Sequence, residues 1–243
     1  MATGAPVAPA AAARHRAALA WTMTASRFSG FGPAVTDWFV ALASDNSRAY
    51  WAATRDIWQR DVRDPLEALL AELAEEVGGR VKLFRPHRDQ RFARGGGPLK
   101  ANAGGLVLGA AASAASRYLD VSADGFYAGT GFHRFERDQL ARYRAAVAGD
   151  AGGELAQALD AARRGGLEVG GETLRGAPQG VARDHPRIEL LRRKGVYLGA
   201  SLPPGDALET RAPLELARRV WAEAADVVAW LDAHVGASEP DAA

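Results

Sequence analysis

Residues 84–102 read FRPHRDQRFARGGGPLKAN, and we call this stretch the basic segment. It gathers five cations around one acid, Asp89: Arg85, Arg88, Arg91, Arg94 and Lys100. Because side chains alternate along an extended strand, one face of this segment would be almost wholly ionic. Guanidinium groups suit carboxylate or phosphate, and the glycines at 95–97 let backbone amides approach an anion closely. The segment therefore predicts a pocket for an anion.

Two other interpretations of the basic segment stay open. Asp89 and acids elsewhere could neutralise the cations in an ion-pair network that only stabilises the fold. The cations could instead form the solvated face of an edge strand, although the interleaved Phe84 and Phe92 favour a half-buried strand. Several cations beside one acid need further partners, because an unpaired buried charge costs several kcal/mol. We expect the ligand contacts to come from Arg85, Arg88, Arg91 and Lys100.

Length and composition bound the class of protein. The 243 residues, 48% of them hydrophobic, suffice for one globular domain with a substantial core. A formal net charge of +1 gives no overall attraction to nucleic acid or anionic lipid, so any preference for anions must be local. The chain has no cysteine, and its five histidines are not spaced as metal ligands. We expect a cytoplasmic protein without a metal or other cofactor.

We expect a single globular domain over residues 23–236, with a disordered tail at each end. Residues 1–22 are rich in alanine and proline, and Arg14, His15 and Arg16 interrupt any apolar core of a signal peptide or membrane span. Met23 directly precedes the first patterned sequence, so a start at Met1 or at Met23 stays open. Residues 237–243 form the second expected tail, and no stretch is long and apolar enough for a transmembrane helix.

Apolar residues at helical spacing predict helices at both ends of the domain. The first three are expected at residues 34–43, 48–60 and 64–77, the third beginning at an Asp64–Pro65 cap and ending at Gly78. Further helices are expected at residues 136–147, 154–164 and 213–235. One more helix is expected to begin at the sequence Asp184-His185-Pro186.

Alternating residues predict strands at residues 81–88, 105–112, 116–122 and 126–133. Their short connections favour an antiparallel meander, with a hairpin turn at residues 123–125. A second hairpin is expected about Gly170 and Gly171, between residues 167–169 and 172–174, and residues 196–201 add a strand. The predicted fold class is α+β, with a mainly antiparallel sheet, meander plus hairpin, covered by N-terminal and C-terminal helices.

Candidates for proton transfer are also present. His185 or His133 could exchange a proton near neutral pH, with Asp89 or Asp184 orienting a partner. The sequence Asp184-His185-Pro186 is equally typical of a helix start, which explains it without catalysis. The chain contains no phosphate-loop, HExxH or nucleophile-elbow sequence, and the 95–97 glycines do not match a dinucleotide fingerprint. Whether the protein is an enzyme stays open.

Three blocks of the sequence resemble the signatures of one family. They are residues 84–102, residues 128–147 (AGTGFHRFERDQLARYRAAV) and residues 174–195 (LRGAPQGVARDHPRIELLRRKG). FSGF at residues 28–31 and SDNSRAYW at residues 44–51 extend the match. The chain resembles the bacterial family known as domain of unknown function 2461, for which the resemblance implies no established reaction. It directs attention to the arginines of the first block, to Lys100, and to Asp184 and His185.

We expect a domain that recognises an anion, with a phosphate or carboxylate ligand, and we leave open whether it is an enzyme. One alternative is a nucleic-acid-associated module in which the basic segment contacts phosphates and Phe92, Trp51 or Tyr50 stacks on bases. The low net charge disfavours that alternative. A second alternative is a structural or interaction domain whose arginine cluster is only an ion-pair network. No membrane partner is expected, and the oligomeric state is left open.

Overall fold

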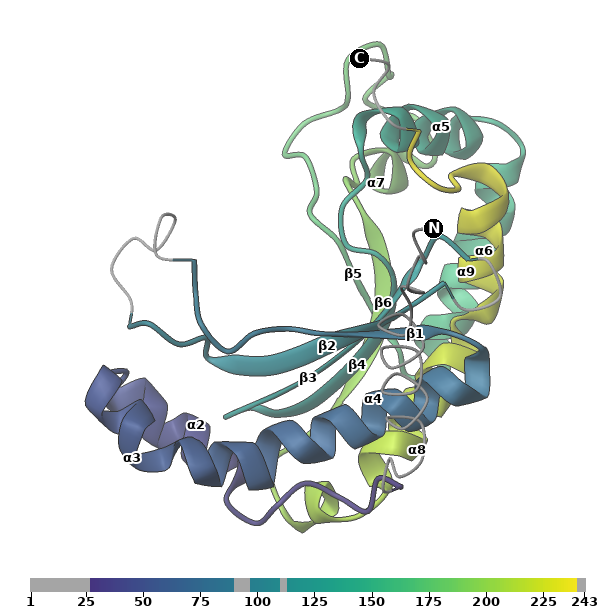
Figure 1. The fold of residues 1–243 in the computed structure, drawn as a ribbon. Helices are drawn as coiled ribbons and strands as arrows, with labels where there is room; N and C mark the ends of the chain where they lie inside the picture. Colours follow the sequence, from purple (N-terminus) through teal and green to yellow (C-terminus); the bar gives the residue numbers. More distant parts are fainter. Residues whose placement is uncertain (1–26, 90–96, 110–112, 240–243) are drawn as a thin grey trace, which may run out of the picture.

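The fold is built on one six-stranded antiparallel sheet, seen in a computed structural model that describes residues 27–89, 97–109 and 113–239. The strand order is β1-β2-β3-β4-β6-β5. The strands are β1 (Arg80–Leu83), β2 (Asn102–Leu108), β3 (Ser116–Ser122), β4 (Gly125–Phe132), β5 (Glu168–Gly170) and β6 (Val196–Leu202). Helices from both ends of the chain flank this sheet (Figure 1), which confirms the predicted α+β class.

The helices lie mainly on one face of the sheet and beyond its β5 edge (Figure 1). They are α2 (Val35–Ser44), α3 (Arg48–Trp58), α4 (Asp64–Val77), α5 (Arg137–Ala148), α6 (Ala151–Arg164), α7 (Ile188–Leu191), α8 (Ala212–Glu223) and α9 (Ala225–His234). Helix α4 contacts β1 and β2, α2 contacts β3, and α8 contacts β4 and β6. The four apolar residues predicted to form one face of the first helix are the buried residues of α2: Val35, Trp38, Phe39 and Leu42.

Strand register separates the two faces of the sheet. Val107, Leu119, Ala128 and Leu198 occupy the face beneath the helices, and each of them is completely buried. Their neighbours in sequence point to the opposite side, because side chains alternate along a strand. Burial of the apolar set against the helices therefore fixes which residues line the opposite face. We call this opposite face the uncovered face, because the described helices lie mainly on the other side of the sheet.

The helical segment from residue 48 to residue 77 is continuous, contrary to the expected new start at Asp64. Between α3 and α4 lies the π turn η2 (Gln59–Arg63), in which the Asp64 N–H donates to the Gln59 carbonyl. Pro65 has no N–H to offer to the carbonyl of Asp61, four residues earlier. That carbonyl accepts instead from the Gly32 N–H at 2.9 Å. The distant partner explains why a wider turn replaces a helix break here.

Strands β1 to β4 form the predicted meander, but the first strand is shorter than expected. Regular pairing of β1 stops at Leu83, and Pro86 cannot donate to a ladder. Residues 84–89 and 97–101 then form the two sides of a projecting segment, and we call these described residues the arm. Its two sides still pair, because Arg88 N donates to Pro98 O and Lys100 N to Pro86 O, both at 2.8 Å.

The second hairpin, expected about Gly170 and Gly171, is not formed. β5 pairs with β6, so that Glu168 lies opposite Gly199, and Thr173 forms a bridge with Arg193. The chain bends at Gly171, whose φ of 127° suits glycine, and runs on beside the same neighbour. The glycine pair therefore makes a bend in one edge segment and not a turn between two strands.

The long helix expected at residues 213–235 is divided into α8 and α9 at Ala224. Residues 237–239, expected to begin a disordered tail, contact α5 through Asp138 and Arg142. Residues 1–22 and 240–243 lie outside the described residues. We call α5, α6, α7 and residues 171–195 the lobe, and the uncovered sheet face lies between it and the arm (Figure 1).

Candidate functional site

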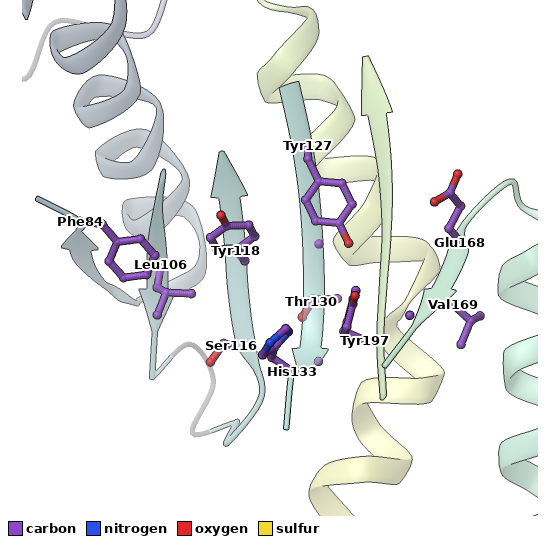
Figure 2. Close-up of a pocket in the computed structure, with 13 residues that line it drawn as sticks. Phe84, Leu106, Ser116, Tyr118, Tyr127, Thr130, His133, Glu168, Val169 and Tyr197 are labelled. Carbon is purple, nitrogen blue, oxygen red and sulfur yellow. The ribbon is translucent and has the colours of Figure 1, made fainter. Parts of the chain in front are cut away.

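The uncovered face of the sheet carries a pocket of about 630 Å³. Figure 2 shows its side chains spread across the strands, from Phe84 at the start of the arm to Glu168 on β5. The lining is mostly aromatic or small: Phe84, Leu106, Ser116, Tyr118, Tyr127, Gly129, Thr130, Gly131, His133, Glu168, Val169, Gly170 and Tyr197. Its volume lies in the range of small-molecule sites.

Glycines make room for the tyrosine rings of the pocket. Tyr127 reaches over Gly199 on the neighbouring strand, where an added Cβ atom would collide with the Tyr127 hydroxyl. The same hydroxyl would lie 2.7 Å from a Cβ atom at Gly129. Tyr197 covers Gly170 in the same way. The rings therefore lie against bare backbone, which gives the pocket a broad aromatic floor.

Two hydrogen bonds from Asn102 connect it to Tyr118 and Asp120 on this face. The Asn102 side-chain amide donates to the Tyr118 hydroxyl at 3.1 Å and to Asp120 Oδ2 at 2.5 Å. Gly104 lies opposite Asp120, and a Cβ atom there would be 2.9 Å from Asp120 Cβ.

Burial shifts the acidities of these groups. Loss of solvent raises the pKa of Asp120 above its ordinary value, and the hydrogen bond from Asn102 only partly offsets this rise. Burial likewise raises the pKa of Tyr118, with the Asp120 charge adding to the effect. Burial also raises the pKa of Tyr127. Both phenols are therefore neutral hydrogen-bonding groups at neutral pH.

The arm is attached at its base by the SDNS turn. The Asn46 side chain accepts from Leu99 N and donates to Leu99 O, both at 3.0 Å, as a neighbouring strand would. A Cβ atom at Gly97 would collide with Asn46, so glycine is needed for this approach. The Trp51 ring packs edge-on against His87, with ring centres 5.6 Å apart. These contacts fix the arm beside one end of the pocket.

Three of the four predicted ligand-binding cations, Arg85, Arg88 and Lys100, lie on this arm. Lys100 Nζ lies 5.3 Å from the centre of the Phe84 ring, which lines the pocket. Arg85 is exposed and Arg88 is half-buried, and in the described part of the chain neither they nor Lys100 form an ion pair. Asp89 does have an interaction partner. Arg91 lies outside the described residues.

Of the candidate proton-transfer residues, only His133 lines the pocket. It is exposed after β4, and its ring packs on Tyr197 with centres 5.6 Å apart. Asp184 is exposed in the lobe, and His185 Nδ1 accepts from Arg187 N at 3.0 Å, just before α7. The local helix-start interpretation accounts for this contact. Catalytic roles for Asp184 and His185 stay predictions that the pocket does not support.

The sequence reasoning missed the tyrosines of the pocket and the Asn102–Asp120 pair. One available signal was a tyrosine followed two residues later by glycine, which places both on one face of a strand. It occurs at Tyr127 and again at Tyr197. The alternation of Tyr118 with Asp120 was another such signal.

Within the described ranges 27–89, 97–109 and 113–239, no group of three or more histidine, aspartate or glutamate side chains could hold a metal ion. No helix within those ranges is long and apolar enough to cross a membrane.

Comparison with protein families matches residues 34–230 to the family described as "Conserved hypothetical protein (DUF2461)". Comparisons with curated proteins and with solved structures give no match. The family match spans both the arm and the lobe and covers most of the chain. The chain therefore belongs to the DUF2461 family of conserved hypothetical proteins.

Proposed function

We propose that the protein binds a small organic anion with a flat ring system on the uncovered face of its sheet. The observation that carries this proposal is the pocket itself, with an aromatic floor and with Lys100 next to Phe84, one of its lining residues. Apolar pockets with few polar groups are typical of small-molecule sites. The proposal keeps the predicted preference for an anion and assigns it to this cavity.

The ring preference follows from the floor of the pocket. The ring centre of Tyr118 lies 6.3 Å from that of Phe84 and 6.2 Å from that of Tyr127. Aromatic faces separated in this way offer offset stacking to a flat ligand. An aliphatic ligand of the same charge would lose that contribution.

The charge preference follows from Lys100. An ammonium group near the Phe84 ring gains a cation–π attraction, yet in the described chain it has no carboxylate partner. A ligand carboxylate or phosphate at this edge would supply one. Arg85 and Arg88, on the same arm, would add to the local positive potential.

A binding experiment tests the proposal. Isothermal titration calorimetry would compare 2-naphthoate and 2-naphthyl phosphate with the uncharged 2-naphthylmethanol. We expect saturable binding of at least one anion, and weaker binding of the alcohol. Lys100→Met should weaken anion binding about tenfold, since a hydrogen bond to a charged group contributes about 1.5–3 kcal/mol. The matched variant Arg219→Met removes one charge from α8, on the covered side, and should bind as the wild type does.

Three results would overturn the proposal: no binding of either anion, equal binding of the alcohol, or an unaltered affinity in Lys100→Met. A thymidine oligonucleotide is titrated in parallel at two salt concentrations. Binding of that oligonucleotide with a steep loss of affinity in salt would favour the nucleic-acid alternative instead.

A further inference from the structure

The β5 end of the pocket contains three oxygen-bearing side chains that the proposed function leaves unused. They are the hydroxyls of Tyr127 and Tyr197 and the carboxylate of Glu168, on the neighbouring strands β4, β6 and β5 (Figure 2). Glu168 has the only carboxylate among the described residues that line the pocket. The opposite end of the pocket is formed by Phe84, beside which Lys100 lies. The two ends therefore differ in charge.

Strand register brings the Tyr127 hydroxyl close to Glu168. Gly199 of β6 lies opposite Gly129 on one side and opposite Glu168 on the other. The Tyr127 hydroxyl lies over this row, because it is 2.7 Å from the position of a Cβ atom at Gly129 and would collide with one at Gly199. The Cβ atoms of directly opposite residues are about 4.5–5.5 Å apart. The Tyr127 hydroxyl is therefore about one strand spacing from the side chain of Glu168.

The Tyr197 ring reaches β5 from its own strand. Its hydroxyl is 2.6 Å from the position of a Cβ atom at Gly170, the residue opposite Tyr197 on β5. Gly170 and Glu168 are two residues apart, so they face the same side of the strand at a separation of about 7 Å. The two hydroxyls therefore lie beside Glu168, one across the sheet and the other along β5.

All three oxygen-bearing groups are free to contact a ligand. Within the described part of the chain, none of Tyr127, Tyr197 and Glu168 has a hydrogen-bond or ion-pair partner. A phenol oxygen accepts hydrogen bonds as well as donating one, whereas a carboxylate only accepts them. Glu168 is exposed, and solvent-exposed carboxylates are charged at neutral pH, so this end of the pocket disfavours an anion. A primary ammonium group has three N–H donors and a positive charge, and it can satisfy all three oxygens.

From this arrangement we propose that the β5 end of the pocket binds a primary ammonium group of the ligand, through Glu168 and the hydroxyls of Tyr127 and Tyr197. The two tyrosine rings add a cation–π attraction to the hydrogen bonds. The inference rests on the proposed function and narrows it, because the ligand becomes a flat aromatic compound with an acid group on one side and an amine on the other. Opposite charges at the two ends of the pocket orient such a ligand in one direction.

The test uses three probes that have no acid group: 2-naphthylmethylammonium, its N-trimethyl derivative and the uncharged 2-naphthylmethanol. Calorimetry is run at about pH 7, where alkylammonium and carboxyl groups are both charged. We expect the wild type to bind the primary ammonium probe at least about threefold more tightly than the alcohol, as suits an exposed carboxylate. It should also bind the primary ammonium probe more tightly than the trimethyl derivative, because the latter has no N–H to donate.

Variants assign the preference to the three side chains. Glu168→Gln keeps the shape and removes the charge, so the preference for the ammonium probe over the alcohol should disappear. The matched variant Glu154→Gln changes an exposed glutamate of α6 outside the pocket and should keep the preference. Tyr197→Phe removes one of the three acceptors and should narrow the gap between the primary and the trimethyl probe about twofold.

Four results would overturn the inference: no binding of the ammonium probe, equal binding of the alcohol, tighter binding of the trimethyl derivative, or a preference that persists in Glu168→Gln. Failure of the proposed function looks different. The naphthoate titration uses a ligand without an ammonium group and depends on Lys100, so it can fail while the ammonium probe still binds.

Discussion

The arm and the lobe are both rich in arginine, yet they use it differently. In the lobe, Arg187 donates to backbone oxygens at the end of α5, those of Val147, Ala148 and Gly149. Arg192 likewise donates to carbonyls of the segment after β5, those of Leu174 and Arg175. In the described part of the arm, Arg85 and Arg88 form no ion pair.

The contrast shows that local acceptors, and not the number of arginines, determine whether a basic segment is structural. The last carbonyls of a helix have no partner within the helix, and the negative end of the helix dipole attracts a cation. At the end of α5, Arg187 supplies both hydrogen-bond donors for these carbonyls and a positive charge for the helix dipole. In the described part of the arm, neither Arg85 nor Arg88 forms a comparable hydrogen bond to a helix end.

The largest effect is expected from Arg187→Met. This change leaves the carbonyl oxygens after α5 without their charged donor, so we expect a loss of about 2–3 kcal/mol in the free energy of unfolding. Urea unfolding followed by tryptophan fluorescence measures it. The matched variant Arg88→Met, in the arm, should change stability by less than about 0.5 kcal/mol. Equal losses in the two variants would abolish the distinction between arm and lobe.

A smaller effect is expected from Asn46→Ala, which releases the base of the arm. Leu99 is almost fully buried, and its N–H and carbonyl groups would lose the two bonds that Asn46 makes. We expect a loss of about 1–2 kcal/mol in stability. Faster hydrogen exchange at the Leu99 amide should accompany it.

Asp45→Ala, next to Asn46 but exposed, is the control and should leave Leu99 exchange unchanged. Naphthoate binding should also weaken in Asn46→Ala, because the arm positions Lys100. Unchanged exchange at Leu99 in Asn46→Ala would show that other contacts hold the arm.

Much of the fold could be predicted because helical and strand periods are local properties of the sequence. The buried face of α2 and the meander of β1 to β4 followed from apolar spacing and short connections. The failures arose where a partner lies far along the chain. The Asp61 carbonyl accepts a hydrogen bond from the Gly32 N–H, which allows the π turn before Pro65. Thr173 forms a β-bridge with Arg193 instead of closing a hairpin.

The site was predicted only in part, for the same reason. Lys100 and His133 were singled out by their chemistry. In the structure Lys100 lies beside Phe84, which lines the pocket, and His133 itself lines the pocket. Tyr118 and Tyr127 were interpreted only as strand residues. Their importance depends on which sheet face stays uncovered, and that depends on how distant helices pack.

The smallest expected effect is a pH-dependent loss of hydrogen-exchange protection. It is measured by comparing two lysine amides, one in the lobe and one in the arm. Lys194 N in the lobe donates to Glu172 O at 2.7 Å, and Lys100 N in the arm donates to Pro86 O at 2.8 Å. The Lys194 ammonium also binds the Glu172 carboxylate, and this hydrogen bond lowers the pKa of Glu172 below its ordinary value. A lowered pKa means that the stabilisation is complete above the unfolded-state pKa of about 4.3 and is lost as the pH falls through the folded-state value.

Hydrogen-exchange protection factors, which correct for the intrinsic pH dependence of exchange, report this difference between the two regions. Between about pH 6 and pH 3, protection of the Lys194 amide should fall about twofold, as suits an exposed ion pair. Protection of the Lys100 amide should stay constant, because no carboxylate in the described chain pairs with that lysine. In Lys194→Met the change at residue 194 should disappear. A parallel fall at both amides would instead indicate global opening in acid, in which case the pair in the lobe would have no separate stabilising role.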